Sequence, residues 1–433
     1  MTAGPAAGFE TREEPEGAIL IQLVERDRDR AVRLVGELEQ LVRTVGLRPL
    51  ASQLVALSHP SPATLLGKGR IETLAQDVED SGARVVVFNN PVSPVQQRNL
   101  ERSLKAKVID RTGLILEIFS LRARTREGRL QVELASLLYQ QSRLVRSWTH
   151  LERQRGGLGQ RGGPGETQIE VDRRLIRQRI NRLEKSLKEV TRTRSLHRRE
   201  RREIPLFTVA LVGYTNAGKS TLFNRLTRAG VDAEDKLFAT LDPTVRAVTL
   251  PGGGRALLSD TVGFIRDLPH QLVAAFRATL EEVREADLLL HVVDLSDPQW
   301  REQRATVLEV LQELESHRKP MLTLYNKIDL LDADAGGLPE RLEEQEASLA
   351  ISAHTGTGVA AMLERLEREV SREWGLLRLE VPVTEGALLA RLCREGRVLE
   401  QRDGDEVIQL TVALPAAARG RLAADIEKYS PAS

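Results

Sequence analysis

The sequence predicts a multidomain α/β protein that carries a long antiparallel helical hairpin. Strand-like apolar runs alternate with helical patterns over residues 17–128 and again over 205–375, which favours parallel sheets covered by helices. Between these regions, apolar residues recur at heptad spacing, which indicates paired helices. The 433 residues suffice for two to four domains, at about 100–200 residues per domain.

The first domain is expected over residues 17–128, after a small, polar and acidic tail at 1–16 that we expect to be disordered. Gly67-Lys68-Gly69-Arg70 lacks the spacing of a phosphate-binding loop, so we interpret it as a strand-to-helix turn and keep a second nucleotide site as the alternative. The strands are predicted at 19–24, 53–57, 84–88 and 107–109, and the helices at 32–42, 71–79, 95–104 and 114–121.

The hairpin is predicted over residues 129–204, as helices at 130–153 and 168–203. At 1.5 Å per residue, the second helix would be about 54 Å long. The connection at 155–167 holds six glycines and a proline, so we expect a loop at the tip. The seam of the second helix steps by four, three, four and three residues, through Ile176, Ile180, Leu183, Leu187 and Val190.

The hairpin is strongly basic, although the net charge of the chain is only +1. Residues 143–202 contain 18 Lys/Arg and 7 Asp/Glu, which indicates a polyanion that approaches from one side. Glycines let a backbone approach RNA closely, and Arg153, Arg155 and Arg161 can neutralise its phosphates. A merely solvated basic surface is the alternative. Aromatic residues make up only 3%, which argues against RNA readout by stacking.

The remaining composition excludes several classes of protein. No apolar run approaches the ~20 residues needed to span a bilayer, and the N-terminus lacks the basic and apolar regions of a signal peptide. We expect a cytoplasmic monomer, with peripheral attachment to a membrane as an alternative location. The single cysteine, Cys393, excludes an intrachain disulfide and a cysteine-cluster zinc site, and we expect it in the core.

A phosphate-binding loop directly follows the predicted strand 207–212. Its glycines let main-chain N–H groups surround phosphates at a helix N-terminus. Lys219 can reach the β- and γ-phosphates, and Ser220 can ligate Mg²⁺. The loop matches GxxxxGK[ST] through Gly213, Tyr214, Thr215, Asn216, Ala217, Gly218, Lys219 and Ser220.

Two further segments complete a site for a nucleoside triphosphate. After the strand 256–258, Asp260 would hold Mg²⁺ through water, and the Gly263 N–H would sense the γ-phosphate. Upstream, Thr240 can complete the Mg²⁺ coordination. Phe264 stands where many small GTPases place a glutamine that orients the attacking water, so we predict slow intrinsic hydrolysis that a partner completes. The two segments are Phe238, Ala239, Thr240, Leu241 and Asp242, and Asp260, Thr261, Val262 and Gly263.

Guanine selection is expected after the buried strand 321–325. The Asp329 carboxylate can accept hydrogen bonds from guanine N1–H and the 2-amino group, whereas adenine would leave it unpaired. A backbone N–H after Ile351 can meet the guanine O6. The predicted base-binding residues are Asn326, Lys327, Ile328 and Asp329, with Ser352, Ala353 and His354. Together these motifs predict a GTPase domain over 205–375, followed by a small α+β domain over 376–433 that reads β-α-β-β-α.

The motifs resemble the translation-factor class of P-loop GTPases, and their combination resembles the HflX family of ribosome-associated GTPases. The resemblance covers roughly residues 17–375, and His354 departs from the lysine that GTPases often carry there. The stretches that carry it are LLGKG, NNPVSPVQQRNLE (89–101), the glycine-rich loop with GGPGETQ (155–168), GYTNAGKST and LFATLD.

The resemblance implies an N-terminal α/β domain with the hairpin, a central GTPase domain and a small C-terminal domain. It further implies binding of the large ribosomal subunit through rRNA, with the hairpin tip toward the peptidyl-transferase region, and separation of stalled ribosomes after stress. Related GTPases suggest a K⁺ ion at Asn216, for which a local turn is the alternative. The rival function is an RNA-dependent NTPase that remodels RNA with ATP in the N-terminal domain, and a third is a nucleotide-regulated scaffold with no important turnover.

Overall fold

A computed structural model describes residues 15–24, 27–56, 59–154, 168–201, 207–227, 237–238, 240–267, 280–331, 348–404 and 406–431. The chain forms two compact units, one of residues 1–121 with 135–180 and the other of residues 122–134 with 181–433. Three separate sheets of four, six and three strands confirm the predicted multidomain α/β class. The boundaries predicted for the individual domains stay predictions.

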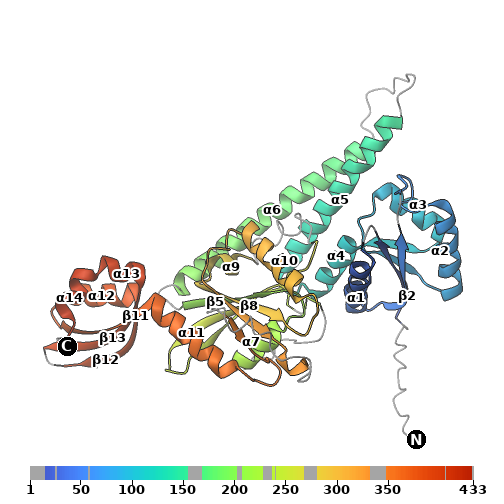
Figure 1. Cartoon of the computed structure of the whole chain (residues 1–433). Helices are drawn as coiled ribbons and strands as arrows, with labels where there is room; N and C mark the ends of the chain where they lie inside the picture. The colour runs from blue at the N-terminus through green and yellow to red at the C-terminus, as the bar shows by residue number, and fades with distance from the viewer. Residues whose placement is uncertain are drawn as a thin grey trace, which may run out of the picture. The chain divides into compact units, whose positions relative to one another are not determined.

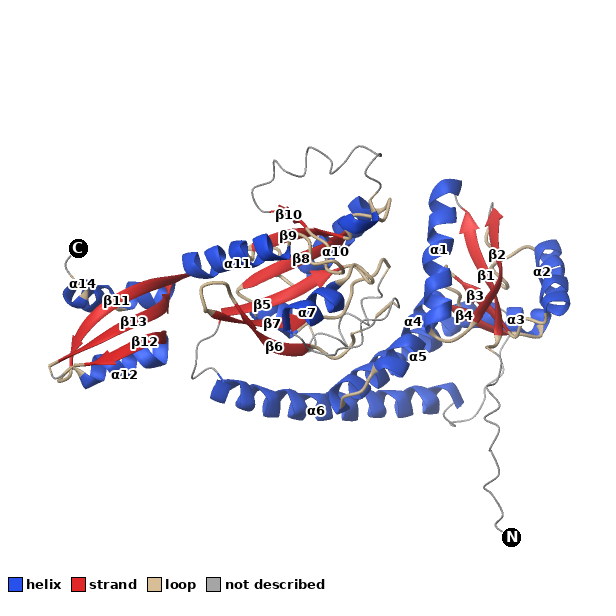
Figure 2. Ribbon diagram, turned by 90° about the horizontal axis from the view of Figure 1, so that it is seen from below, coloured by secondary structure: helices blue, strands red, loops and turns tan. Residues whose placement is uncertain are grey.

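The N-terminal domain is built on a parallel sheet of order β2-β1-β3-β4. Figure 2 shows α1 on one face of this sheet and α2 with α3 on the other. The second face holds the apolar core, in which Ile19, Phe88 and Leu74 are buried. Gly67 is the N-cap of α2, as expected for a strand-to-helix turn. The elements are β1 (Gly17–Val24), α1 (Arg28–Thr44), β2 (Arg48–Ala56), α2 (Lys68–Ser81), β3 (Val85–Phe88), α3 (Pro94–Leu104) and β4 (Lys107–Asp110).

Three helices follow: α4 (Arg111–Arg122), α5 (Arg126–Gln154) and α6 (Gln168–Arg201). The last two run in opposite directions, and the 34 residues of α6 correspond to about 51 Å (Figure 1). Ile180 and Leu183 of the predicted seam are buried. The two predicted helices of the hairpin are therefore confirmed, and their connection at 155–167 lies outside the described residues.

The GTPase region forms a sheet of order β10-β9-β8-β5-β7-β6, parallel except for the edge strand β6. The carboxyl ends of its parallel strands point to one edge, where loops gather side chains for a site. The strands are β5 (Phe207–Gly213), β6 (Thr244–Thr249), β7 (Arg255–Asp260), β8 (Leu288–Asp294), β9 (Met321–Asn326) and β10 (Ser348–Ala350), and the helices are α7 (Lys219–Thr227), α9 (Glu281–Glu285), α10 (Trp300–Glu313), the 3₁₀ turn η1 (Ile328–Leu330) and α11 (Val359–Glu373).

The C-terminal domain has the predicted β-α-β-β order, and two short helices follow where one was predicted. Its strands β11 (Trp374–Pro382), β12 (Arg397–Asp403) and β13 (Val407–Pro415) form an antiparallel sheet of order β11-β13-β12. The helices α12 (Gly386–Glu395), α13 (Ala416–Arg421) and α14 (Ala423–Tyr429) accompany it.

The expectation that Cys393 lies in the core is wrong, because its side chain is exposed. Leu388 and Leu392, four residues apart on α12, point into the domain core. The next residue lies about 100° further around the helix, which turns it away from the sheet. Within the described residues, no helix is both long and apolar enough to cross a membrane.

Candidate nucleotide site

The phosphate-binding loop begins where β5 ends, and close contacts require its two glycines. A Cβ on Gly213 would lie 2.3 Å from the main-chain oxygen of Val292. Gly218 has a φ of +92°, and a Cβ there would lie 2.2 Å from Nδ2 of Asn326. Asn216 also has a positive φ of 61°, which asparagine tolerates better than most residues. The backbone of this loop therefore needs the residue types of the motif.

Lys219, the first residue of α7, has its ammonium buried inside the loop. Its Nζ donates to the main-chain oxygens of Tyr214, at 2.7 Å, and Gly213, at 3.1 Å. Burial lowers the pKa of Lys219 to about 8, and the nearby Asp260 opposes this shift. A phosphate in the loop would favour the charged form again, so the position suits a polyanionic ligand.

The three groups predicted for the metal site converge beside Lys219. The Ser220 hydroxyl donates to Oδ2 of Asp260 at 2.8 Å and lies 2.9 Å from the Thr240 hydroxyl, which donates to the same oxygen at 2.6 Å. Asp260 is fully buried, and among the described residues its Oδ1 has no hydrogen-bond partner. Burial raises the pKa of this carboxyl, which a cation would lower. Two hydroxyls and an unsatisfied carboxylate oxygen fit a hard cation such as Mg²⁺.

The segment after Asp260 is joined to the phosphate-binding loop through the backbone. The Thr215 N–H donates to the Phe264 carbonyl at 2.7 Å, and the Phe264 N–H donates to the Gly213 carbonyl at 3.1 Å. A Cβ on Gly263 would lie 3.0 Å from the Lys219 Nζ, so only glycine leaves room there. The Phe264 side chain is buried, which leaves it unable to orient a water.

The segment that contains Thr240 uses its apolar side chains as anchors. Phe238 and Leu241 are both buried, so their side chains hold the segment against the domain. The Asp242 carboxylate accepts hydrogen bonds from Thr125, at the start of α5. Ala239 lies outside the described residues. Of this predicted segment, the structure therefore brings Thr240 to the metal cluster and directs Asp242 to a helix.

Asn326 connects the phosphate-binding loop to the segment predicted to meet the guanine O6. Its side chain is buried, with Nδ2 donating to the Ala217 carbonyl at 2.8 Å. Its Oδ1 accepts from the Ala353 N–H, also at 2.8 Å. One amide side chain thus holds together two loops that come from β5 and β10.

Asp329 lies at the carboxyl end of β9, within η1. Its side chain is exposed and so remains accessible to a base. The preceding Lys327 has a φ of 64°, and its ammonium pairs with the Asp294 carboxylate at 2.7 Å. This ion pair joins the residue that follows β9 to the last residue of β8. The base-binding role predicted for Asn326, Lys327, Ile328 and Asp329 stays a prediction.

Sequence reasoning missed Arg225, on α7. Its Nε donates to the Ala353 carbonyl at 2.6 Å, and its Nη2 donates to the His354 carbonyl. Ser352 is buried, and its hydroxyl accepts from the Thr355 N–H at 2.9 Å. Arg225 belongs to no sequence motif. The sequence does not distinguish a helix arginine that binds main-chain carbonyls from one that only faces solvent.

A buried histidine of β8, His291, was also missed. Neither of its ring nitrogens has a hydrogen-bond partner among the described residues. Burial lowers its pKa to about 3, with Arg304 and Lys219 adding to the shift. His291 therefore stays neutral at ordinary pH and serves as a core side chain.

The arginines predicted to bind RNA lie at or beyond the end of the described hairpin. Arg153 falls in the last turn of α5. Arg155 and Arg161 belong to the connection at 155–167, outside the described residues. Their contacts with RNA stay predictions.

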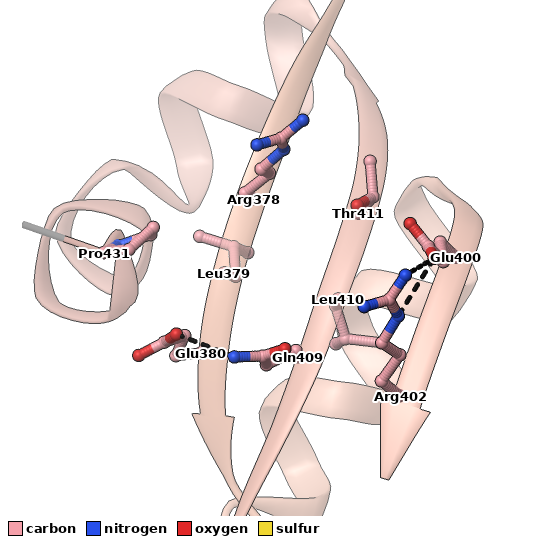
Figure 3. A pocket seen from close by; sticks show the side chains of 9 residues that line it. All are labelled: Arg378, Leu379, Glu380, Glu400, Arg402, Gln409, Leu410, Thr411 and Pro431. Atoms are coloured by element: carbon pink, nitrogen blue, oxygen red, sulfur yellow. Dashed lines mark hydrogen bonds and ion pairs between the residues drawn. The ribbon is translucent and has the colours of Figure 1, made fainter. Parts of the chain in front are cut away.

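A hollow of about 390 Å³ lies on the C-terminal sheet. Figure 3 shows the side chains that line it. Its polar side chains are partly paired among themselves. Arg402 forms an ion pair with Glu400 at 2.8 Å, and Gln409 donates a hydrogen bond to Glu380 at 3.1 Å. None of the predicted nucleotide-binding residues lines it. The lining residues are Arg378, Leu379, Glu380, Glu400, Arg402, Gln409, Leu410, Thr411 and Pro431.

Comparison with protein families gives three matches along the chain. The families described as GTP-binding GTPase N-terminal and GTP-binding GTPase Middle Region match residues 33–120 and 122–201. The family described as 50S ribosome-binding GTPase matches residues 208–327. In turn, these matches cover strands β2 to β4 of the N-terminal sheet, the hairpin helices, and the nucleotide site as far as Lys327.

Individual proteins are similar over nearly the whole chain. The GTPase HflX of Magnetococcus marinus is 60% identical over 424 residues, which cover 97% of each chain. That of Escherichia coli is 45% identical over 408 residues, which cover 94% of this chain and 95% of the relative. A solved GTP-binding protein of Sulfolobus solfataricus, in complex with GDP, is 24% identical, with a TM-score of 0.46, and covers 82% of this chain and 98% of that one.

Proposed function

We propose that this chain, which belongs to the HflX family of GTPases, binds the large ribosomal subunit and uses GTP binding and hydrolysis to split or rescue stalled ribosomes under stress. The similarity to the HflX GTPases and the family matches confirm the predicted family membership and GTP-hydrolase activity. Ribosome binding in the family is supported by the match to 50S ribosome-binding GTPases. We infer that the protein works in the cytoplasm, as a monomer on the ribosome.

The observation that carries the nucleotide part of the proposal is the cluster of Ser220, Thr240 and Asp260 beside the Lys219 ammonium. GTPases generally use Mg²⁺, which would stabilise charge on the phosphates. Ser220 and Thr240 would hold the ion, and Asp260 would hold its water. Asn216, with its left-handed backbone, is the candidate for a K⁺ contact. Asp329 would select GTP and GDP over adenine nucleotides.

GTP would order two segments, around Thr240 and Gly263, which hydrolysis would then release. The Gly263 N–H would meet the γ-phosphate, beside Lys219. Because Phe264 is buried, no side chain at that position orients the attacking water. We infer that a ribosomal surface completes the hydrolysis site.

Slow turnover by the protein alone is the expected result of a hydrolysis assay, with a marked rise when large ribosomal subunits are added. GTP and ATP are titrated in parallel, with and without subunits. A fast GTPase rate that subunits leave unchanged would contradict the proposal. ATP turnover that rises with RNA, while GTP turnover does not, would instead support RNA remodelling.

The ribosome part of the proposal rests on the basic hairpin. Along the described part of α6, the exposed residues include Arg174, Arg177, Arg182, Lys185 and Lys188. Such a surface binds phosphates through counterion release rather than base readout. The glycine-rich connection would let the chain approach rRNA closely.

Replacing Arg153, Arg155 and Arg161 together by alanine is expected to weaken binding to the large subunit and to abolish splitting. The slope of log affinity against log salt should fall by roughly 0.7–0.9 for each phosphate that the variant no longer neutralises. GTP affinity should stay at the parent value, because these residues precede the phosphate-binding loop by 52 to 60 positions and the 34-residue helix α6 lies between them. Co-sedimentation with a non-hydrolysable GTP analogue at several salt concentrations measures the effect.

The matched control carries the same loss of three charges at the exposed Arg33, Arg102 and Arg318. It should bind and split ribosomes like the parent. Equal losses in both triple variants would mean that net charge alone matters. Parent-like binding and splitting by the tip variant would show that the tip is an inert loop.

A further inference from the structure

A carboxylate next to the metal cluster binds the residues that immediately precede the first helix of the hairpin. The Asp242 carboxylate accepts hydrogen bonds from the main-chain N–H groups of Arg124 and Thr125, at 3.0 and 2.9 Å. It also accepts from the Thr125 hydroxyl at 2.5 Å. All three donors lie 117 or 118 positions earlier in the sequence, in the same compact unit as Asp242.

Thr125 is the N-cap of α5, and its hydroxyl serves two partners at once. Besides donating to Asp242, it accepts from the N–H of Gly128 at 2.9 Å, which is the N-cap hydrogen bond to the third helical residue. The Thr125 carbonyl accepts the first helical bond, from Arg129, at 3.1 Å. The carboxylate also lies where the positive end of the helix dipole favours an anion.

Gly128 leaves room for this carboxylate. A Cβ at residue 128 would lie 2.4 Å from Oδ1 of Asp242 and 3.2 Å from the Thr125 hydroxyl. Alanine in a helix is otherwise more favourable than glycine. A glycine in the first turn of a 29-residue helix is thus explained by its contact with Asp242.

The same short segment is held at its other end by the metal cluster. Thr240, only two residues before Asp242, donates to Asp260 and contacts the Ser220 hydroxyl. Leu241, between them, is buried. Two residues span at most about 7 Å of extended chain. A shift of Asp242 is therefore expected to move the Thr240 hydroxyl as well.

We propose that Thr125 is a positioning residue for the GTP-bound state: through Asp242, the start of α5 holds Thr240 at the metal cluster. Thr125 lies outside the stretch 208–327 that matches the ribosome-binding GTPase family, in the middle region that contains the hairpin. Because coupling is reciprocal, a ligand that recruits Thr240 also stabilises the first turn of α5. The proposal rests on the proposed GTP and Mg²⁺ roles of Thr240, and it names the contact by which nucleotide reaches the hairpin.

The test compares affinities for a GTP analogue and for GDP in the full chain with Mg²⁺. On the proposed function, Thr240 would ligate Mg²⁺ only when a γ-phosphate is present. Thr125→Ala should therefore weaken analogue binding by roughly fivefold and leave GDP binding at the parent value. Thr125→Ser keeps the hydroxyl and should restore the analogue affinity. Unchanged GDP affinity also shows that the variant is folded.

Gly128→Ala should produce the same selective loss, because its methyl group displaces the carboxylate. Gly69→Ala is the matched control, since a Cβ there meets nothing within 4 Å in another helix. Combining Gly128→Ala with Asp242→Ala should leave the effect of Asp242→Ala alone, because the methyl group then has nothing to displace. A Gly128→Ala loss that persists undiminished in the double variant would overturn the proposal.

Amide hydrogen exchange supplies a readout that does not depend on turnover. In the parent, the analogue should slow exchange at the N–H groups of Arg124, Thr125 and Gly128 relative to GDP, and Thr125→Ala should remove that difference. An unchanged analogue-to-GDP affinity ratio in both Thr125→Ala and Gly128→Ala would overturn the proposal and leave a simple helix cap. If the parent itself binds neither nucleotide, the proposed function fails instead.

Discussion

Replacing Asp329 by asparagine is expected to weaken GTP binding by about 2–4 kcal/mol. The carboxylate would lose two charge-assisted hydrogen bonds from guanine, and the amide would place a donor against the guanine 2-amino group. Because the Asp329 side chain is exposed, we expect the substitution to leave the fold unchanged. Calorimetric titration of GTP and GDP measures the loss, which should be equal for both because the contact is to the base.

Xanthine nucleotides provide the matched rescue. Xanthine carries a carbonyl oxygen in place of the 2-amino group, so the asparagine amide can donate to it. The Asp329→Asn variant should therefore prefer the xanthine nucleotide to GTP, and the parent should show the opposite order. Unchanged GTP affinity in the folded variant would refute the role assigned to Asp329.

Truncating Asn326 to alanine should lower the free energy of unfolding by about 2–6 kcal/mol and weaken the binding of GTP and GDP alike. The change leaves the Ala217 carbonyl and the Ala353 N–H without their buried partner, and each unsatisfied group costs about 1–3 kcal/mol. The phosphate-binding loop and the loop near the base then lose their shared tie. Equal loss for both nucleotides distinguishes this variant from those at Thr125.

Thr323→Ala is the control for Asn326→Ala, since it truncates another buried polar side chain on β9. It should leave nucleotide affinity close to the parent value. Thermal unfolding of both variants separates a general loss of stability from a loss at the site. Parent-like affinity in folded Asn326→Ala would mean that the two loops are positioned without this side chain.

The residues of the phosphate-binding loop were recognisable because their requirement is local. Gly213 and Gly218 occupy backbone positions where a Cβ would collide with a neighbouring strand or side chain, and Lys219 begins the helix that follows. The heptad spacing that includes Ile180 and Leu183 likewise predicted α6, because apolar residues three and four positions apart lie on one face of a helix. Their contacts with nucleotide and RNA stay predictions.

Other features could not be read from local patterns. Cys393 is exposed because its helix turns Leu388 and Leu392 to the sheet, which depends on where that helix packs. Arg225 clamps the carbonyl of Ala353 across 128 positions of sequence. No spacing of residues in the sequence predicts either the exposure of Cys393 or the hydrogen bond from Arg225 to Ala353.

By itself, the sequence determined the α/β alternation, the paired helices, the order of the GTPase motifs and the family, because each depends on residue type and short spacing. Only the tertiary structure decided that Asp260 keeps a buried oxygen with no partner among the described residues, that Asn326 joins two loops, and that Asp242 binds the residues just before α5. Two of these contacts join residues more than a hundred positions apart, Asn326 with Ala217 and Asp242 with Thr125. The order of strands in the sheet and the docking of helices bring such residues together, and local periodicity carries no information about either.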